Sequence, residues 1–129
     1  MPSHWIALFA VALGSALGGM LRYWIRESMP HILPIPFPVA TLLVNLVGCF
    51  MAGFLLIYWQ QLSLSPYIKT AVMVGFLGAL TTFSAFSLDT LLLVNQGFWL
   101  KAGWNIILNV LLSLLAVFTG AWLGGKISQ

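Results

Sequence analysis

Four long apolar stretches, interrupted by only seven charged residues, limit what this 129-residue chain can fold into. Hydrophobic residues make up 61% of the sequence and charged ones 5%, whereas a soluble domain carries about 25% charged residues. A membrane-spanning helix needs roughly 20 apolar residues, and four such segments fit, at about 5–25, 37–59, 68–94 and 100–124. The chain is therefore predicted to be an all-α integral membrane protein, with residues 1–129 forming one four-helix domain.

Turn-forming residues separate the four segments. The proline-rich run from Pro30 to Pro38 is expected to end the first helix, because proline cannot continue one. Ser65-Pro66 opens the third segment, and Asn95-Gln96-Gly97 separates the third from the fourth. All six tryptophans and all three tyrosines lie near the proposed ends, as expected for an interfacial belt. Residues 1–21 carry no charge, so the basic region of a cleavable signal peptide is missing and the first helix is expected to remain.

The distribution of basic residues does not decide the orientation of the chain in the membrane. Four spans place Lys69 and Lys126 on the side of both termini, and Arg22, Arg26 and Lys101 on the opposite side. Two against three is almost no bias, so insertion in both orientations and a fixed orientation remain equally open. A net charge of +3 is too sparse to indicate nucleic acid. A homodimer, antiparallel if the chain inserts both ways, would be an economical way for so short a chain to build a transport path.

The most informative segment is residues 75–87, GFLGALTTFSAFS, in the middle of the third apolar stretch. Polar groups at membrane depth are costly and usually face a pore or a partner. Four hydroxyls and two glycines predict that the helix breaks here. Backbone carbonyls between Gly78 and Thr81 would then be freed from helical bonding and could coordinate a cation, as helix breaks in transporters do.

Other polar side chains are expected at similar depths. Asn45 lies near the middle of the second segment with Thr41 one turn before it, and Arg22 lies late in the first. A stripe on the fourth segment consists of Asn105, Asn109 and Ser113. Taken singly, such groups hydrogen-bond across helices for roughly 1 kcal/mol each. Together they favour a pathway, and neutral donors without core carboxylates suit an anion better than a cation or a proton.

Phe83 and Phe86 lie three residues apart and share one helical face within this polar segment. The edge of a phenylalanine ring carries positive charge, so a small anion could lie against ring edges in an apolar constriction. The alternative is that both phenylalanines only pack. Their interleaving with Thr81, Thr82 and Ser84 favours the anion site.

Three motifs resemble those of the Fluc (CrcB-type) fluoride channels of microbes, and the likeness covers nearly the whole chain. Residues 18–23, GGMLRY, look like the family's G-x-x-x-R-[WY] pattern at the end of helix one. Residues 41–48, TLLVNLVG, look like T-L-x-x-N-x-x-G. Residues 75–87 look like the long and specific G-F-x-G-G-x-T-T-F-S-T-F-S.

The resemblance implies a dual-topology antiparallel homodimer with two fluoride-selective pores that export F− passively across a bacterial plasma membrane. It implies a channel and not an enzyme. The implied pore residues are Phe83 and Phe86 as an aromatic box, Asn45 as a donor to the ion, Arg22 and Thr41 towards the vestibule, Ser113 on a hydroxyl track, and the neighbouring Thr82 and Ser84. A structural Na+ is implied at the dimer interface, held by the backbone carbonyls of Gly78 and Thr81 from both subunits.

The chain departs from the family pattern at five positions, which are Ala79, Ala85, Asp89, Asn109 and Val117. Carbonyl coordination of a cation is compatible with Ala79, since it uses backbone atoms. Ala85 and Val117 remove hydroxyls near the implied pore, so they bear on the conduction rate more than on the function.

Two other classes of protein compete with the channel. A small four-helix, dual-topology multidrug exporter needs a membrane-embedded carboxylate in its first helix, and here no acidic residue precedes Glu27. A membrane scaffold that transports nothing should not need the pair Phe83 and Phe86.

Overall fold

The computed structural model describes residues 3–129, and within them all regular structure is helical. Four stretches are long and apolar enough to cross a membrane: His4–Ile32, Val39–Gln61, Pro66–Asn95 and Trp99–Ile127. In chain order the elements are α1 (His4–Ile32), α2 (Val39–Tyr58), η1 (Trp59–Gln61), α3 (Pro66–Thr70), η2 (Ala71–Leu77), α4 (Gly78–Leu80), α5 (Phe83–Asn95) and α6 (Trp99–Ile127). The prediction of an all-α chain with four potential membrane spans is confirmed.

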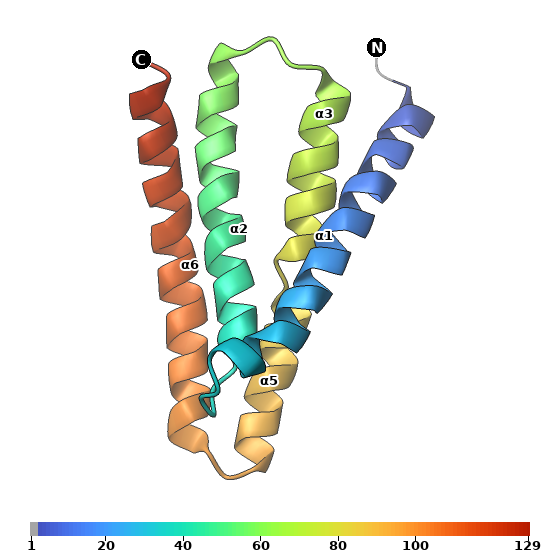
Figure 1. Ribbon diagram of the computed structural model, residues 1–129. Coiled ribbons are helices and arrows are strands. Elements are labelled where there is room, and N and C mark those ends of the chain that lie inside the picture. Colours follow the sequence, from blue (N-terminus) through green and yellow to red (C-terminus); the bar gives the residue numbers. More distant parts are fainter. Residues whose placement is uncertain (1–2) are drawn as a thin grey trace.

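The helices associate in two pairs (Figure 1). α2 lies along α6, and α1 inclines across η2 and α4 of the third span. α5 packs against the first part of α6 and so connects the two pairs. Both termini and the loop between α2 and α3 lie at one end of the molecule, as an even number of spans requires.

The first helix is longer than the sequence indicates. The prediction that the proline-rich run from Pro30 onward cannot continue the helix is wrong at its first proline, because Pro30 lies inside α1, which ends at Ile32. A proline in the last turn removes only one helical hydrogen bond. The helix stops where Leu33 precedes Pro34, because a residue before proline is disfavoured in the α conformation; Leu33 accordingly has φ −134° and ψ 84°.

The third span is irregular along its length. η2 is a π-helix of seven residues. This form is rare in proteins overall, but where it occurs it is often at a functional site. After the short α4, Thr81 and Thr82 are extended, with ψ values of 153° and 125°. Thr82 caps α5, since its Oγ1 accepts a hydrogen bond from the Ala85 amide at 3.0 Å.

Glycines allow both helix pairs to approach closely. A Cβ at Gly14 or Gly18 of α1 would collide with backbone atoms of η2, and a Cβ at Gly53 or Gly120 would collide with backbone between α2 and α6. Small residues that bring helix backbones together are typical of membrane helix packing. These four positions fix the spacing of the bundle.

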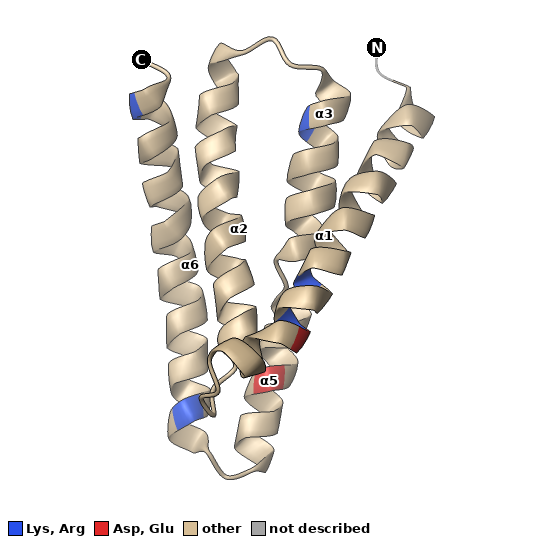
Figure 2. Ribbon diagram, viewed as in Figure 1, with Lys and Arg blue, Asp and Glu red and all other residues tan. Residues whose placement is uncertain are grey.

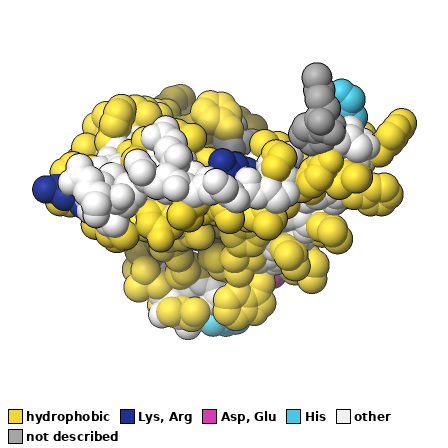
Figure 3. All heavy atoms as spheres, turned by 90° about the horizontal axis from the view of Figure 1, so that it is seen from above, with side chains coloured by type: hydrophobic (Ala, Val, Ile, Leu, Met, Phe, Trp, Pro, Cys, Tyr) yellow, Lys and Arg dark blue, Asp and Glu magenta, His cyan; other side chains and the backbone are white. Residues whose placement is uncertain are grey.

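The outside of the molecule is apolar. Trp5, Leu100 and Phe118, from the first and last helices, are each at least 71% exposed, and hydrophobic side chains cover most of the perimeter in the view from above (Figure 3). Basic positions lie towards both ends of the bundle (Figure 2). This surface is suited to lipid along the sides and to water at the ends.

Candidate functional site

A groove of about 440 Å³ lies where α2, α6 and the extended residues of the third span meet. It is open on one side. Its lining residues are Asn45, Cys49, Gly78, Thr81, Thr82, Phe83, Phe86, Asn109, Val110, Ser113 and Leu114. The groove therefore combines hydroxyls, amides and two aromatic rings in an otherwise apolar surface.

The two phenylalanines of the groove differ in their surroundings. Phe83 is 76% exposed, whereas Phe86 is buried. Their ring centroids are 5.2 Å apart with an interplanar angle of 67°, which is an edge-to-face arrangement. Because the rings are nearly perpendicular, the pair presents both a ring edge and a ring face to its environment.

Asn45 holds the extended segment from both sides. Its Oδ1 accepts a hydrogen bond from the Thr82 amide at 2.8 Å, and its Nδ2 donates to the Thr82 carbonyl at 3.2 Å. Nδ2 also donates to Oδ1 of Asn109 at 3.0 Å. Asn45 is buried, so its amide is the polar partner that lets the backbone of residue 82 leave the helix at membrane depth.

The hydrogen bonds around Thr82 change the bonding of the Gly78 and Thr81 carbonyls. In a continuous α-helix the amide of residue 82 would donate to the carbonyl of Gly78, and the amide of residue 85 to the carbonyl of Thr81. Here the Thr82 amide donates to Asn45 and the Ala85 amide donates to the Thr82 hydroxyl. The carbonyls of Gly78 and Thr81 have therefore lost their helical donors.

The polar stripe of α6 is largely buried. Asn105 has no exposed surface and Asn109 only 5%. Asn109 Nδ2 donates to the Asn105 carbonyl at 2.8 Å and to Asn105 Oδ1 at 3.0 Å. Ser113 is the exception, because within residues 3–129 its buried Oγ has no oxygen or nitrogen partner, and only the weakly bonding Cys49 thiol lies close to it. A buried hydroxyl in this condition, beside a groove, is free to bind a ligand.

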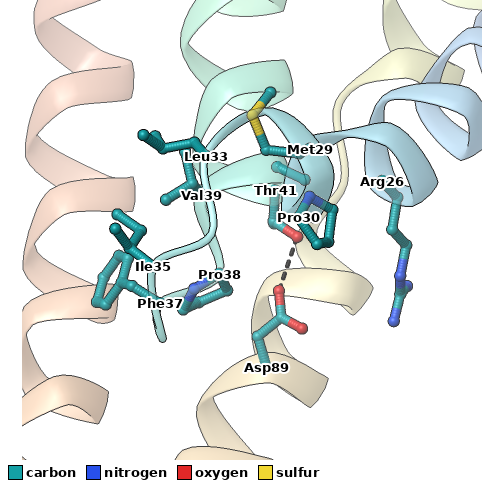
Figure 4. A pocket seen from close by; sticks show the side chains of 11 residues that line it. Arg26, Met29, Pro30, Leu33, Ile35, Phe37, Pro38, Val39, Thr41 and Asp89 are labelled. Carbon is teal, nitrogen blue, oxygen red and sulfur yellow. Dashed lines mark hydrogen bonds between the residues drawn. The ribbon is translucent and has the colours of Figure 1, made fainter.

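A second cavity, of about 200 Å³, lies towards the end of the bundle that carries the proline-rich loop (Figure 4). Arg26, Thr41 and Asp89 line it together with apolar residues of the loop. Thr41 Oγ1 donates to Asp89 Oδ2 at 2.7 Å, while the Arg26 side chain extends apart from that carboxylate. The cavity thus has an acidic and a basic side chain on different walls.

A narrow space of about 10 Å³ lies between these two openings. Arg26 and Thr41 line it as they line the larger cavity, and Thr82 lines it as it lines the groove. Arg22 also contributes to this space, and its Nε donates to the carbonyl of Ala79 at 3.0 Å. The shared lining residues make one series of polar groups from the loop cavity to the groove.

The structure brings most of the predicted site residues into these spaces. In the groove lie Phe83, Phe86, Asn45, Thr82, Ser113, Gly78 and Thr81; beside the narrow space lie Arg22 and Thr41. Ser84 does not line the groove and is exposed, with its Oγ 3.3 Å from Thr82 Oγ1. Sequence reasoning missed the pairing of Thr41 with Asp89, for which no local signal exists, since 48 positions separate them.

Four apolar helices with a polar groove at an irregular third span define a small multi-pass membrane protein. The family described as "CrcB-like protein, Camphor Resistance (CrcB)" matches residues 9–121. The chain belongs to this family. Its multi-pass architecture and its relatives are consistent with a bacterial inner membrane.

Several relatives carry the name "Fluoride-specific ion channel FluC". The protein of a Nitratiruptor species is 47% identical over 111 residues, which cover 86% of each chain. The protein of a Shewanella species is 46% identical over 113 residues, or 88% of this chain and 91% of the relative. The protein of Methylococcus capsulatus is 44% identical over 124 residues; these are 95% of this chain and 54% of that longer relative.

Proposed function

We propose that this chain is a fluoride-selective passive ion channel. The observation that carries the proposal is the groove, in which the rings of Phe83 and Phe86 lie beside amide and hydroxyl donors at the extended Thr81–Thr82 segment. The name of the relatives, given to proteins 44% to 47% identical, supports the same ion.

The chemistry of the groove favours a small anion. Asn45, Asn109 and Ser113 offer N–H or O–H groups, and no carboxylate lines the groove. The exposed ring of Phe83 adds an edge with positive charge. Neutral donors bind an anion without trapping it, which conduction requires. Asn45 uses its Nδ2 on Thr82 and Asn109, and Asn109 uses its own Nδ2 on Asn105. Donation by either amide to the ion would therefore compete with one of these bonds.

A second copy of the chain completes the proposed pore. The groove is open on one side, and Phe83, on the first turn of α5, is exposed beside it. An antiparallel partner would close both grooves at once, so the homodimer would contain two pores. The nearly even distribution of basic residues supports insertion in both orientations.

A structural Na+ at the dimer interface is part of the proposal. The carbonyls of Gly78 and Thr81 fit this role because both have lost their helical donors. The space beside Gly78 is open, since a Cβ added there would meet only the Met73 carbonyl oxygen, at 3.9 Å. Two copies would supply four oxygens, a donor set that suits a hard monovalent cation. When bound, the ion would supply a fixed positive charge between the two pores.

The proposed direction of transport is out of the cytoplasm. HF is a weak acid that enters cells from acidic surroundings and dissociates in the more neutral interior. A passive path then lets F− leave down its gradient, which relieves fluoride toxicity without an energy source.

The multidrug-exporter alternative has no support from the relatives or from the positions of the acidic residues. Glu27 is exposed near the end of α1, and Asp89 accepts a hydrogen bond from Thr41 in the loop cavity. Neither carboxylate lies in the middle of the first helix, where proton exchange for a drug would need it.

Passive efflux from liposomes tests the proposed function. Purified protein is reconstituted with both F− and Cl− inside, valinomycin and K+ balance the charge, and ion-selective electrodes follow each anion. Rapid F− efflux without Cl− efflux is expected. Equal rates for the two anions, or no F− efflux from folded dimers, would contradict a selective fluoride channel.

A further inference from the structure

A continuous chain of five hydrogen bonds surrounds the first turn of α5. Ordered from first donor to last acceptor, its members are Thr82, Asn45, Asn109, Asn105, Thr90 and Phe86. Every donor–acceptor distance lies between 2.8 and 3.0 Å. This series of hydrogen bonds starts at the Thr82 amide and ends at the Phe86 carbonyl. It therefore binds both ends of the first turn of α5, which carries the two phenylalanines of the groove.

The direction of this asparagine chain is fixed. Each of its three amides accepts through Oδ1 from the preceding member and donates through Nδ2 to the next. Reversing any one amide would bring two donors or two acceptors together in a buried place. Asn105 has no exposed surface, so water does not offer a substitute partner. The orientation of one amide therefore favours the matching orientation in the others. Backbone carbonyls support it, because Asn45 Nδ2 also donates to the Thr82 carbonyl and Asn109 Nδ2 to the Asn105 carbonyl.

We propose that Asn105 is a positioning residue for the candidate site. It does not line the groove, and it acts by orienting Asn109 and, through Asn109, the Asn45 amide that captures the Thr82 backbone. Losing that orientation weakens the hydrogen bond from the Thr82 amide to Asn45. The Thr82 amide can then return to the Gly78 carbonyl, its acceptor in a regular helix. This inference rests on the proposed function only for its effect on conduction, because the extended segment is present whatever ion the groove binds.

Amide hydrogen exchange tests the positioning role independently of any ion. In Asn105→Leu, the exchange of the Thr82 amide in lipid nanodiscs is expected to accelerate about fivefold, which corresponds to the loss of one net hydrogen bond. Thr119→Val is the matched control, because its exposed hydroxyl donates only to Leu115 within α6. Unchanged exchange at Thr82 in a folded Asn105→Leu protein, or equal acceleration in the control, would overturn the proposal.

A second variant guards against misfolding. Should Asn105→Leu not yield folded protein, Thr90→Val is measured instead, since it removes the acceptor of the Asn105 amide and the last donor of the chain. We again expect faster exchange of the Thr82 amide, although Thr82 lies eight positions before Thr90 in the sequence. Exchange at the unsubstituted rate would overturn the proposal.

Fluoride efflux gives the second reading on the same variants. Asn105→Leu is expected to lower efflux about fivefold, and Thr119→Val is expected to leave it unchanged. Normal efflux in spite of faster exchange would overturn the proposed effect of Asn105 on conduction. If the unsubstituted protein shows no F− efflux, the proposed function fails, and the exchange measurement alone then decides whether Asn105 positions the segment.

Discussion

Phe83 is 76% exposed although it begins a helix in the middle of a membrane span. A ring that served only to fill the core of one chain would be buried, as Phe86 is. Both rings line the same groove, and Asn45 holds the residue just before Phe83 through its backbone amide and carbonyl. At the scale of single residues, the candidate site thus combines the exposed ring of Phe83 with the buried amide of Asn45, which holds the residue at the start of α5 in place.

Replacing Phe83 with isoleucine removes the ring edge while keeping an apolar side chain. We expect Phe83→Ile to lower F− efflux at least tenfold, because the aliphatic group has no positive edge to offer an anion. The measurement is liposome efflux on protein that elutes in size-exclusion chromatography at the same volume as the unsubstituted protein. Phe118→Ile is the matched control, since Phe118 is 71% exposed on α6 and does not line the groove; normal efflux in Phe83→Ile would refute the role of the ring.

Replacing Ser113 distinguishes a role in ion binding from a role in packing, because the two roles predict opposite changes in the melting temperature. Its buried Oγ has no oxygen or nitrogen partner among the described residues, and the adjacent Cys49 thiol is only a weak one. A buried hydroxyl without a strong partner costs about 1–3 kcal/mol. Ser113→Ala is therefore expected to raise the thermal melting temperature and at the same time to lower F− efflux several-fold. A fall in both quantities would show that the hydroxyl is structural and does not belong to the ion path.

At the scale of secondary-structure elements, the candidate site depends on the irregular third span. The π-helix η2 packs against α1, the extended pair Thr81–Thr82 follows α4, and α5 then begins at Phe83. Close packing through Gly14 and Gly18 holds η2 in place. The irregular backbone lies half-buried beside α2, whose Asn45 supplies the missing partner, as membrane depth demands.

Withdrawal of Na+ tests the proposed cation between the two copies. We expect replacement of Na+ by N-methylglucamine at constant ionic strength to lower the melting temperature of the protein by roughly 5 °C or more, because a ligand that binds only the folded state stabilises it. Efflux of F− should fall in parallel. A melting temperature and an efflux that are both insensitive to Na+ would remove the cation from the proposal.

Basic residues are distributed almost evenly between the two halves of the molecule. Lys69 lies in α3 and Lys126 in the last turn of α6, in the half of the chain's spans next to both termini. Arg22, Arg26 and Lys101 belong to the opposite half, and Figure 2 shows basic positions in both halves of the bundle. Loop charges set orientation through small differences in Lys and Arg count. A chain this close to balance is sensitive to one or two added charges.

Added charges test whether function needs both orientations. Gln60→Lys with Gln61→Lys adds two basic residues next to the loop between α2 and α3, and should fix one orientation and abolish F− efflux. His31→Lys with Gln96→Lys favours the opposite orientation and should also be inactive alone. Reporter fusions check each orientation, and co-expression of the two variants should restore efflux. Full activity of either variant alone, with one orientation demonstrated, would exclude an antiparallel dimer.

Much of the fold and of the site was predictable because it depends on local composition. The four spans follow from apolar length, and the membership of Phe83, Phe86 and Asn45 in one groove agrees with the motifs that carry the family likeness. The extent of α1 was not predictable in the same way. Pro30 indicates a helix end in the sequence, but in the last turn of α1 its effect is small, and Leu33 before Pro34 ends the helix.

The sequence by itself determined the membrane class, the number of spans and the inventory of polar groups at depth, since hydropathy and side-chain chemistry are properties of neighbouring residues. Only the tertiary structure decided how those groups pair. Asn45 reaches Thr82 across 37 positions and Asn109 across 64. Such partners are chosen by how the helices pack, because inside a membrane each polar group must find a donor or acceptor on whichever helix lies beside it.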